Sequence, residues 1–200
     1  MTVLIAIKEE DSVFLGADKQ VTGGQIKQDK DTKIFKKELK TINSKDEVIK
    51  TETVYFAETG YVVVGNYIRY GFELPYKKEG QSYEEYIVTK LCTKLNQSLK
   101  ESGLIKVKDS KTYSNTNFLI VMNNNIYTIS NVGLVCEFED YVVDGSGYEV
   151  ALGSLYTSKG KSARERIKLA IEACDKHTIY VNGEYDIIQI KFEEGDDKND

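Results

Sequence analysis

Short apolar runs separated by charged turns dominate the start of the chain. Residues 3–7 and 13–17 are apolar and flank the charged stretch 8–11, which predicts a strand, a tight turn and a second strand. Because the turn reverses the chain, Asp18 is expected beside the chain's beginning. Residues 19–24 are expected to form a loop, and the charged residues 37–52 an exposed excursion such as a hairpin. Further strands are predicted at 31–36, 54–57, 61–64, 118–122, 126–129, 134–136, 141–143 and 187–192.

Two capping boxes mark the starts of predicted helices. Ser82 is followed three residues later by Glu85, and Ser162 by Glu165. At this spacing the two side chains of each pair satisfy backbone N–H groups in the first helical turn. Apolar residues follow each box at helical spacing. Two shorter helices are expected, one beginning at 66–70 and one over 148–156.

The order of these elements favours one fold class. Several strands, two helices, several strands, two helices and a last strand are typical of an α+β layered domain, not of a doubly wound βαβ domain. The chain has 200 residues, of which 40% are hydrophobic and 30% charged. This composition fits a single globular domain over residues 1–192. The acidic residues 193–200 are expected to form a solvated tail.

Composition excludes several classes of function. The net charge of -5 disfavours a nucleic-acid partner. No apolar run approaches the ~18 residues of a membrane span, and no signal peptide is visible. Cys92, Cys136 and Cys174 are scattered and odd in number, as reduced cysteines are in a cytoplasmic protein. No spacing of Cys or His indicates a zinc site, so no metal-ligating side chains are predicted.

Thr2 is the first candidate for chemistry. A small residue at this position predicts removal of the initiator Met1, which would leave Thr2 with a hydroxyl and a free α-amine. An α-amine with an ordinary pKa of about 7.7–8.0 can act as a base near neutral pH. Threonine with its own N-terminal amine is a known nucleophile–base pair. Most proteins with threonine here make no use of it, so the case depends on the residues downstream.

Several later segments, in order, resemble the proteasome β-subunit family and, within it, the bacterial HslV peptidase branch. Residues 17–22, Ala-Asp-Lys-Gln-Val-Thr, are similar to Gly-Asp-Gly-Gln-Val-Ser of that branch. Lys-Ile-Phe follows at 33–35, Gly-Ser-Gly at 145–147, and His-Thr-Ile-Tyr-Val-Asn at 177–182, where the branch has Cys-Ile-Tyr-Thr-Asn. The resemblance covers residues 2–190 and is weakest over 37–60.

The resemblance implies a fold and an activity. The fold would be the four-layer αββα sandwich of the N-terminal-nucleophile hydrolases. The activity would be hydrolysis of peptides or unfolded proteins inside a homo-oligomeric ring, usually fed by an ATP-dependent unfoldase. No nucleic acid or membrane is expected as a partner.

The resemblance also implies roles for three polar residues. Thr2 matches the nucleophile, and its amine matches the base. Lys33 matches the family lysine, whose ammonium disfavours protonation of that amine and so keeps it available. Asp18 matches the carboxylate that pairs with this lysine. The alternatives are an exposed surface lysine and an aspartate that caps a turn.

Four further residues are assigned in the same way. Ser146 matches a serine near the amine, although Gly-Ser-Gly is also a common turn and serine a common helix cap. Gly65 is expected to offer its backbone N–H to the developing oxyanion, the alternative being a glycine that ends a strand. Thr22 and Gly23 are expected to pair with the backbone of an extended substrate.

Two stretches depart from the family pattern. Thr178 replaces the aspartate of the proteasome Arg-Asp-x-x-Ser-Gly segment, as in the HslV branch, where backbone carbonyls bind a cation. A monovalent or divalent cation is therefore implied here, and no other cofactor is expected. The charged residues 36–52 are unlike HslV and leave the partner surface open. Two other functions remain open: an amidase acting on a small amide with the same residues, and an inactive scaffold that retains Met1.

Overall fold

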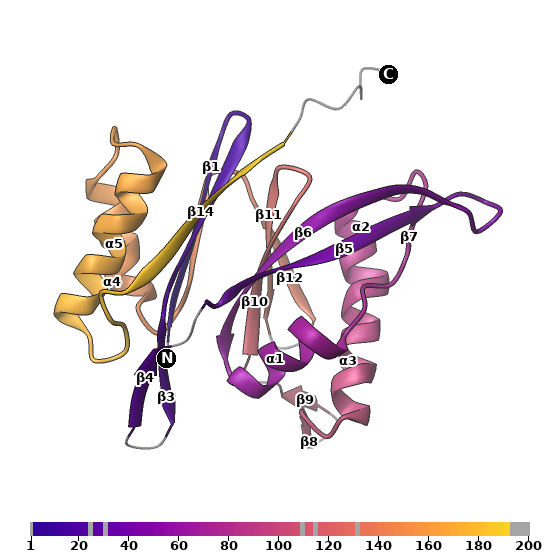
Figure 1. Ribbon diagram of the computed structural model, residues 1–200, viewed down its shortest axis with the longest axis horizontal. Helices are drawn as coiled ribbons and strands as arrows, with labels where there is room; N and C mark the ends of the chain where they lie inside the picture. Colours follow the sequence, from indigo (N-terminus) through magenta and orange to yellow (C-terminus); the bar gives the residue numbers. More distant parts are fainter. Residues whose placement is uncertain are drawn as a thin grey trace. The chain divides into compact units, whose positions relative to one another are not determined.

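The computed structural model describes residues 2–23, 26–29, 32–108, 111–113, 116–130 and 133–192 (Figure 1). The chain divides into two compact units. The first unit comprises Met1–Lys33, Asn123–Ile126 and Phe138–Asp200, and the second comprises Ile34–Met122 and Tyr127–Glu137. The single domain proposed for residues 1–192 stays a prediction. The tail at 193–200 lies outside the described residues.

The first unit is built on an antiparallel four-stranded sheet with the order β13-β1-β2-β14. Its strands are β1 (Val3–Glu9), β2 (Ser12–Asp18), β13 (Tyr141–Gly145) and β14 (Tyr185–Lys191). The register Leu4↔Ala17 between β1 and β2 confirms the predicted hairpin. Strand β1 is buried from Val3 to Ile7 and therefore lies in the middle of a core.

Two helices, α4 (Tyr148–Thr157) and α5 (Ala163–His177), supply the other side of this core. Ile167 and Ile171 of α5 belong to the same apolar cluster as Val3 and Ile5 of β1. A Cβ atom at Gly16 would overlap the Ile167 side chain, so glycine at this position lets α5 lie close to β2. The start of α5 at the second predicted box is confirmed, because the cap residue, Ser162, accepts a hydrogen bond from the Glu165 N–H through its Oγ.

A small hairpin follows β2 in the chain. It consists of β3 (Gln20–Gly23) and β4 (Ile26–Asp29). The prediction of a loop at residues 19–24 is therefore wrong over Gln20–Gly23. The glycine pair suggested a loop, but the antiparallel pairing of β3 with β4 places the first of these glycines inside a strand.

The second unit is built on a six-stranded sheet with the order β12-β11-β10-β6-β5-β7. Its strands are β5 (Ile34–Ile42), β6 (Val48–Gly60), β7 (Lys77–Lys78), β10 (Thr116–Met122), β11 (Asn125–Ser130) and β12 (Leu134–Phe138). Strands β5 and β6 pair from Ile34↔Ala57 to Ile42↔Val48. The charged residues 37–52 thus form the outer part of a long hairpin, which confirms the hairpin predicted for them.

The helices of this unit are α1 (Val62–Gly71), α2 (Tyr83–Tyr86) and α3 (Cys92–Glu101), and a π-helical segment, Ile87–Leu91, joins α2 to α3. The helix start at the first predicted box is confirmed, because Ser82 Oγ accepts a hydrogen bond from the Glu85 N–H at 3.1 Å. Two short strands, β8 (Lys106–Lys108) and β9 (Lys111–Tyr113), pair with each other. Across the described residues, no helix is long and apolar enough to cross a membrane.

The strand predicted at residues 61–64 is wrong, because helix α1 begins at Val62. A run of four apolar residues is too short to distinguish a strand from a helix. In the structure, Val64 and Ile68 are buried in the core while Val63 is 57% exposed, which is helical spacing. Gly60 has a φ of 109° and marks the change from β6 to α1.

Candidate active site

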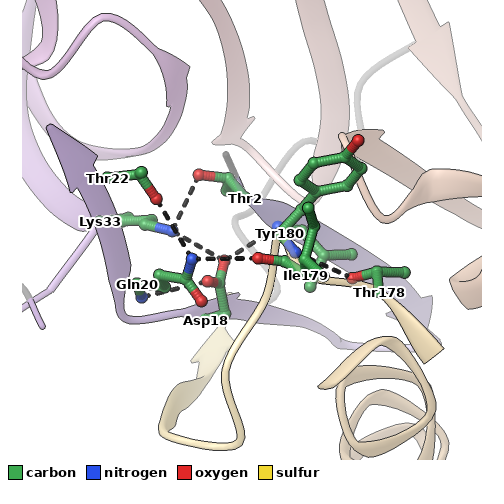
Figure 2. Close-up of polar contacts among 9 residues, drawn as sticks. Thr2, Asp18, Gln20, Thr22, Lys33, Thr178, Ile179 and Tyr180 are labelled. Carbon is green, nitrogen blue, oxygen red and sulfur yellow. Dashed lines mark hydrogen bonds and ion pairs between the residues drawn. The ribbon is translucent and has the colours of Figure 1, made fainter. Parts of the chain in front are cut away.

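Three polar side chains from separate segments of the first unit meet at the start of β1 (Figure 2). Lys33 Nζ donates hydrogen bonds to Thr2 Oγ1 and to Asp18 Oδ1, both at 2.8 Å. Thr2 and Lys33 are each 3% exposed, and Asp18 is 0% exposed. The structure therefore brings together the predicted nucleophile, lysine and carboxylate in a site nearly closed to solvent.

The β1–β2 hairpin explains where Asp18 lies. Because Leu4 pairs with Ala17, the next residue of β2 reaches the first residues of β1. The Val3 N–H donates to Asp18 Oδ1 at 2.9 Å, and the Gln20 N–H donates to Asp18 Oδ2 at 3.1 Å. Both carboxylate oxygens are thus held by backbone groups, which fixes the carboxylate as an acceptor for Lys33.

The electrostatics of the site depend on the pairing of Asp18 with Lys33. Burial raises the pKa of the Asp18 carboxyl above its ordinary value, while the Lys33 ammonium and the two backbone N–H groups act to lower it. Removing one partner of a buried ion pair leaves an uncompensated charge and costs about 3–5 kcal/mol. The Lys33 ammonium therefore favours the ionised form of Asp18, against the effect of burial.

The turn that carries Ser146 lies beside Thr2. Strand β13 pairs with β1 at Val3↔Gly145, and the Gly147 N–H donates to the Thr2 carbonyl at 3.3 Å. The backbone on both sides of Ser146 is thereby fixed next to the candidate nucleophile. The Ser146 side chain itself is exposed, and its part in the reaction stays a prediction.

Comparisons with known proteins concern the sequence and the fold of the whole chain. No protein-family model matches the chain. A protein named proteasome subunit beta, from Nanoarchaeum equitans (strain Kin4-M), is 27% identical over 86% of this chain and 83% of its own length. In sequence, the chain is therefore similar to a proteasome β subunit.

Solved structures show the corresponding fold. The chain is similar to Thiobacillus denitrificans BPH, with a TM-score of 0.70, 19% identity and coverage of 96% of this chain and 100% of that chain. It is also similar to HslV from Trypanosoma brucei, with a TM-score of 0.59, 15% identity and coverage of 95% and 99%. These likenesses confirm the predicted α+β fold class.

Gly65, the residue expected to donate its N–H to the oxyanion, lies in the second unit. It is part of α1 and does not end a strand. Its N–H donates to the Tyr61 carbonyl at 3.3 Å. A Cβ atom at this position would overlap the Glu58 carboxylate, which is a packing reason for glycine. The role of Gly65 as an oxyanion donor stays a prediction.

Thr22 and Gly23 lie on β3, whose one neighbour among the described strands is β4. Thr22 is half-buried, and its Oγ1 accepts a hydrogen bond from Gln20 Nε2 at 3.2 Å. An extended substrate would have to pair with the edge of β3 that β4 leaves open. That pairing stays a prediction.

Sequence reasoning missed Gln20. Its side chain is 2% exposed and its Nε2 also donates to the Ile179 carbonyl at 3.4 Å. Figure 2 shows it beside Asp18, with a dashed line from its amide to the carbonyl of Ile179. The only available signal was its place in the family-like segment 17–22, which did not show that its partner lies 159 positions away.

The cation implied by the resemblance would bind backbone carbonyls of segment 177–183. One of its carbonyls, that of Ile179, already accepts a hydrogen bond from Gln20. The described residues contain no group of three or more His, Cys, Asp or Glu side chains suited to a metal ion. A cation held by backbone carbonyls of this segment stays a prediction, and the reaction proposed below uses no cation.

Proposed function

We propose that the chain is a threonine-type peptidase that hydrolyses peptide bonds with Thr2 as nucleophile after removal of Met1. One observation carries the proposal: Lys33 Nζ lies 2.8 Å from both Thr2 Oγ1 and Asp18 Oδ1. A lysine that is 3% exposed is rarely left in such a place without a charge partner. Here the partner is Asp18. The ammonium also contacts the hydroxyl of Thr2, the residue that would carry a free α-amine after removal of Met1.

The proposed reaction uses the amine of Thr2 as the base. The Thr2 Oγ attacks the scissile carbonyl carbon, and its proton passes to the amine, directly or through a water. The amine then protonates the leaving nitrogen as the C–N bond breaks and an ester to Oγ remains. Water hydrolyses this ester with the amine again as base. Lys33 contributes by disfavouring protonation of the amine and by donating to the reacting oxygen.

Ser146 and Gly65 are included in the proposed mechanism because they match family residues. Ser146 would contact the amine, because its flanking backbone is fixed beside Thr2. Gly65 would donate its N–H to the oxyanion only if that group left the Tyr61 carbonyl. Thr22 and Gly23 would align the substrate backbone along β3.

We also propose that copies of the chain assemble into a homo-oligomeric ring in the cytoplasm. Its sequence relative is named as a proteasome subunit. On α4, Tyr148, Leu152 and Tyr156 lie four residues apart and are 47%, 38% and 66% exposed. Such an exposed apolar stripe is typical of an interaction surface. An ATP-dependent unfoldase as partner and unfolded proteins as substrates rest on the family alone.

Replacing the nucleophile tests the proposal. Thr2→Ala should lower cleavage of unfolded casein and of fluorogenic peptides by more than about 1,000-fold, as expected when a nucleophile is lost. Thr93→Ala, on the exposed side of α3, is the control and should leave cleavage unchanged. Full cleavage by the Thr2 variant would exclude the mechanism. Hydrolysis of small amides without peptide cleavage would instead support the amidase.

A further inference from the structure

Gln20 connects the candidate catalytic residues to a distant segment of the chain. Its backbone N–H donates to Asp18 Oδ2 at 3.1 Å. Its side-chain Nε2 donates to Thr22 Oγ1 at 3.2 Å and to the Ile179 carbonyl at 3.4 Å (Figure 2). One residue therefore contacts the carboxylate of the site, the proposed substrate strand and the turn that follows α5.

That turn is anchored on both sides of Ile179. Thr178 ends α5 with its N–H donating to the Cys174 carbonyl at 2.8 Å. Val181 is 1% exposed and belongs to the apolar core of the first unit. Between these anchors, Ile179 and Tyr180 are 77% and 38% exposed. Two large apolar side chains are thus presented to solvent on the segment that Gln20 holds.

The hydrogen bonds of Gln20 fix which way its amide points. The Ile179 carbonyl can only accept, so the nitrogen of the amide must face it. The other amide atom, Oε1, is buried and has no hydrogen-bond partner among the described protein atoms. An unpaired buried acceptor is unfavourable for folding, and an apolar side chain of the same shape would avoid that penalty. The two hydrogen bonds made by Nε2 have to offset the unpaired Oε1, so the net gain in stability from glutamine at position 20 is small.

We propose that Gln20 is a positioning residue that holds segment 178–180 against the Thr2 site, where Ile179 and Tyr180 contact an apolar side chain of the substrate. The substrates favoured by this contact would be extended peptides with a large apolar side chain near the scissile bond. This inference rests on the proposed peptidase function.

Gln20→Met separates the side chain from the backbone. The variant keeps the backbone N–H that donates to Asp18, and it has nearly the same length and shape. It removes both bonds made by Nε2 and also removes the unpaired Oε1. Gln189→Met is the matched control, because Gln189 is exposed on β14 and its amide lies 3.5 Å from Ser12 Oγ.

The kinetic test compares a peptide substrate with a small β-lactone that acylates Thr2 but is too short to reach segment 178–180. In Gln20→Met, kcat/KM for an apolar peptide should fall by about 5- to 150-fold, the effect of losing two hydrogen bonds. Most of the fall should be in KM. The β-lactone should react within about 2-fold of the unmodified rate, and the control variant should match the original protein in both assays.

A second pair of variants checks the apolar contact itself. Ile179→Ala and Tyr180→Ala should each reduce kcat/KM for the apolar peptide and leave that for a polar peptide of equal length unchanged. The inference is overturned if peptide and β-lactone rates fall together in Gln20→Met, or if neither changes.

Hydrogen exchange decides the structural part without any activity. In Gln20→Met, amide exchange at residues 179–182 should accelerate at least about 10-fold, while the thermal midpoint stays equal or rises. Unchanged exchange there, or a lowered midpoint with exchange accelerated throughout the first unit, would show that Gln20 does not specifically position the segment. If the original protein cleaves no peptide, the proposed function fails, and the exchange result still decides the role of Gln20.

Discussion

Replacing Lys33 with methionine is the sharpest perturbation of the site. Methionine has a similar length and no charge, so the change removes the ammonium that lies 2.8 Å from Thr2 Oγ1 and Asp18 Oδ1. Two consequences should follow from this one change. The amine of Thr2 should become a poorer base at neutral pH, and Asp18, which is 0% exposed, should lose its charge partner.

The size of both effects can be worked out from the structure. A general base contributes typically about 100- to 10,000-fold to a rate, so kcat for peptide cleavage should fall within that range. Loss of one partner from a buried ion pair should lower the free energy of unfolding by about 3–5 kcal/mol at pH 7.5. Peptide cleavage and urea denaturation measure these two quantities separately.

The stability loss should depend on pH in a defined direction. Burial raises the pKa of Asp18, and without Lys33 the largest opposing influence is gone. A carboxyl whose pKa is higher in the folded state stabilises the fold below its unfolded pKa, and this stability is lost as pH rises through the folded pKa. The deficit of Lys33→Met should therefore be small near pH 4 and largest above neutral pH.

A double variant separates charge from packing. Asp18→Asn combined with Lys33→Met leaves no buried charge, so most of the lost stability should return while activity stays low. The reasoning would be refuted if Lys33→Met cleaved peptides at the original rate. It would also be refuted if its stability loss were below about 1 kcal/mol and unaffected by Asp18→Asn.

Two other predictions test the surrounding structure. Iodoacetamide at pH 8 should label exposed Cys136 quickly, whereas Cys92 and Cys174 should react only in urea, because burial raises the pKa of each to about 11. Intact mass should show one adduct on the native protein and three after unfolding. Three rapid adducts on the native protein would contradict this prediction. Gly65→Ala should lower the free energy of unfolding by about 1–3 kcal/mol, because the added methyl group would overpack against the Glu58 carboxylate of β6. Gly153→Ala, with open space at its Cβ position, should raise the free energy of unfolding by up to about 1 kcal/mol. Equal urea midpoints for the two variants would argue against close packing of Gly65 on Glu58.

Local sequence signals predicted the elements whose cause is local. The capping serine Ser162 starts α5 through a hydrogen bond three residues away. Asn123 and Asn124 make the β10–β11 turn with φ values of 46° and 58°, a conformation that asparagine tolerates better than most residues. The errors fell where tertiary pairing decides, at Gln20–Gly23 and at the start of α1.

The candidate site shows the same division. Thr2, Asp18 and Lys33 could be selected from family-like segments in the right order. The contact between Lys33 and Thr2 spans 31 positions and was visible only in the folded chain. Gln20 and Ile179, 159 positions apart, gave no pairwise signal in a single sequence. Hydrogen bonds across such separations depend on strand register and helix placement, which local patterns do not determine.

Intact mass spectrometry after treatment with epoxomicin, the ligand named with a BPH structure similar to this chain, tests the central claim most directly. The account predicts a protein that lacks Met1 and carries one inhibitor adduct, which peptide mapping places on Thr2, and no adduct on Thr2→Ala. Retained Met1, or an adduct that persists in that variant, would contradict a nucleophile activated by its own amine.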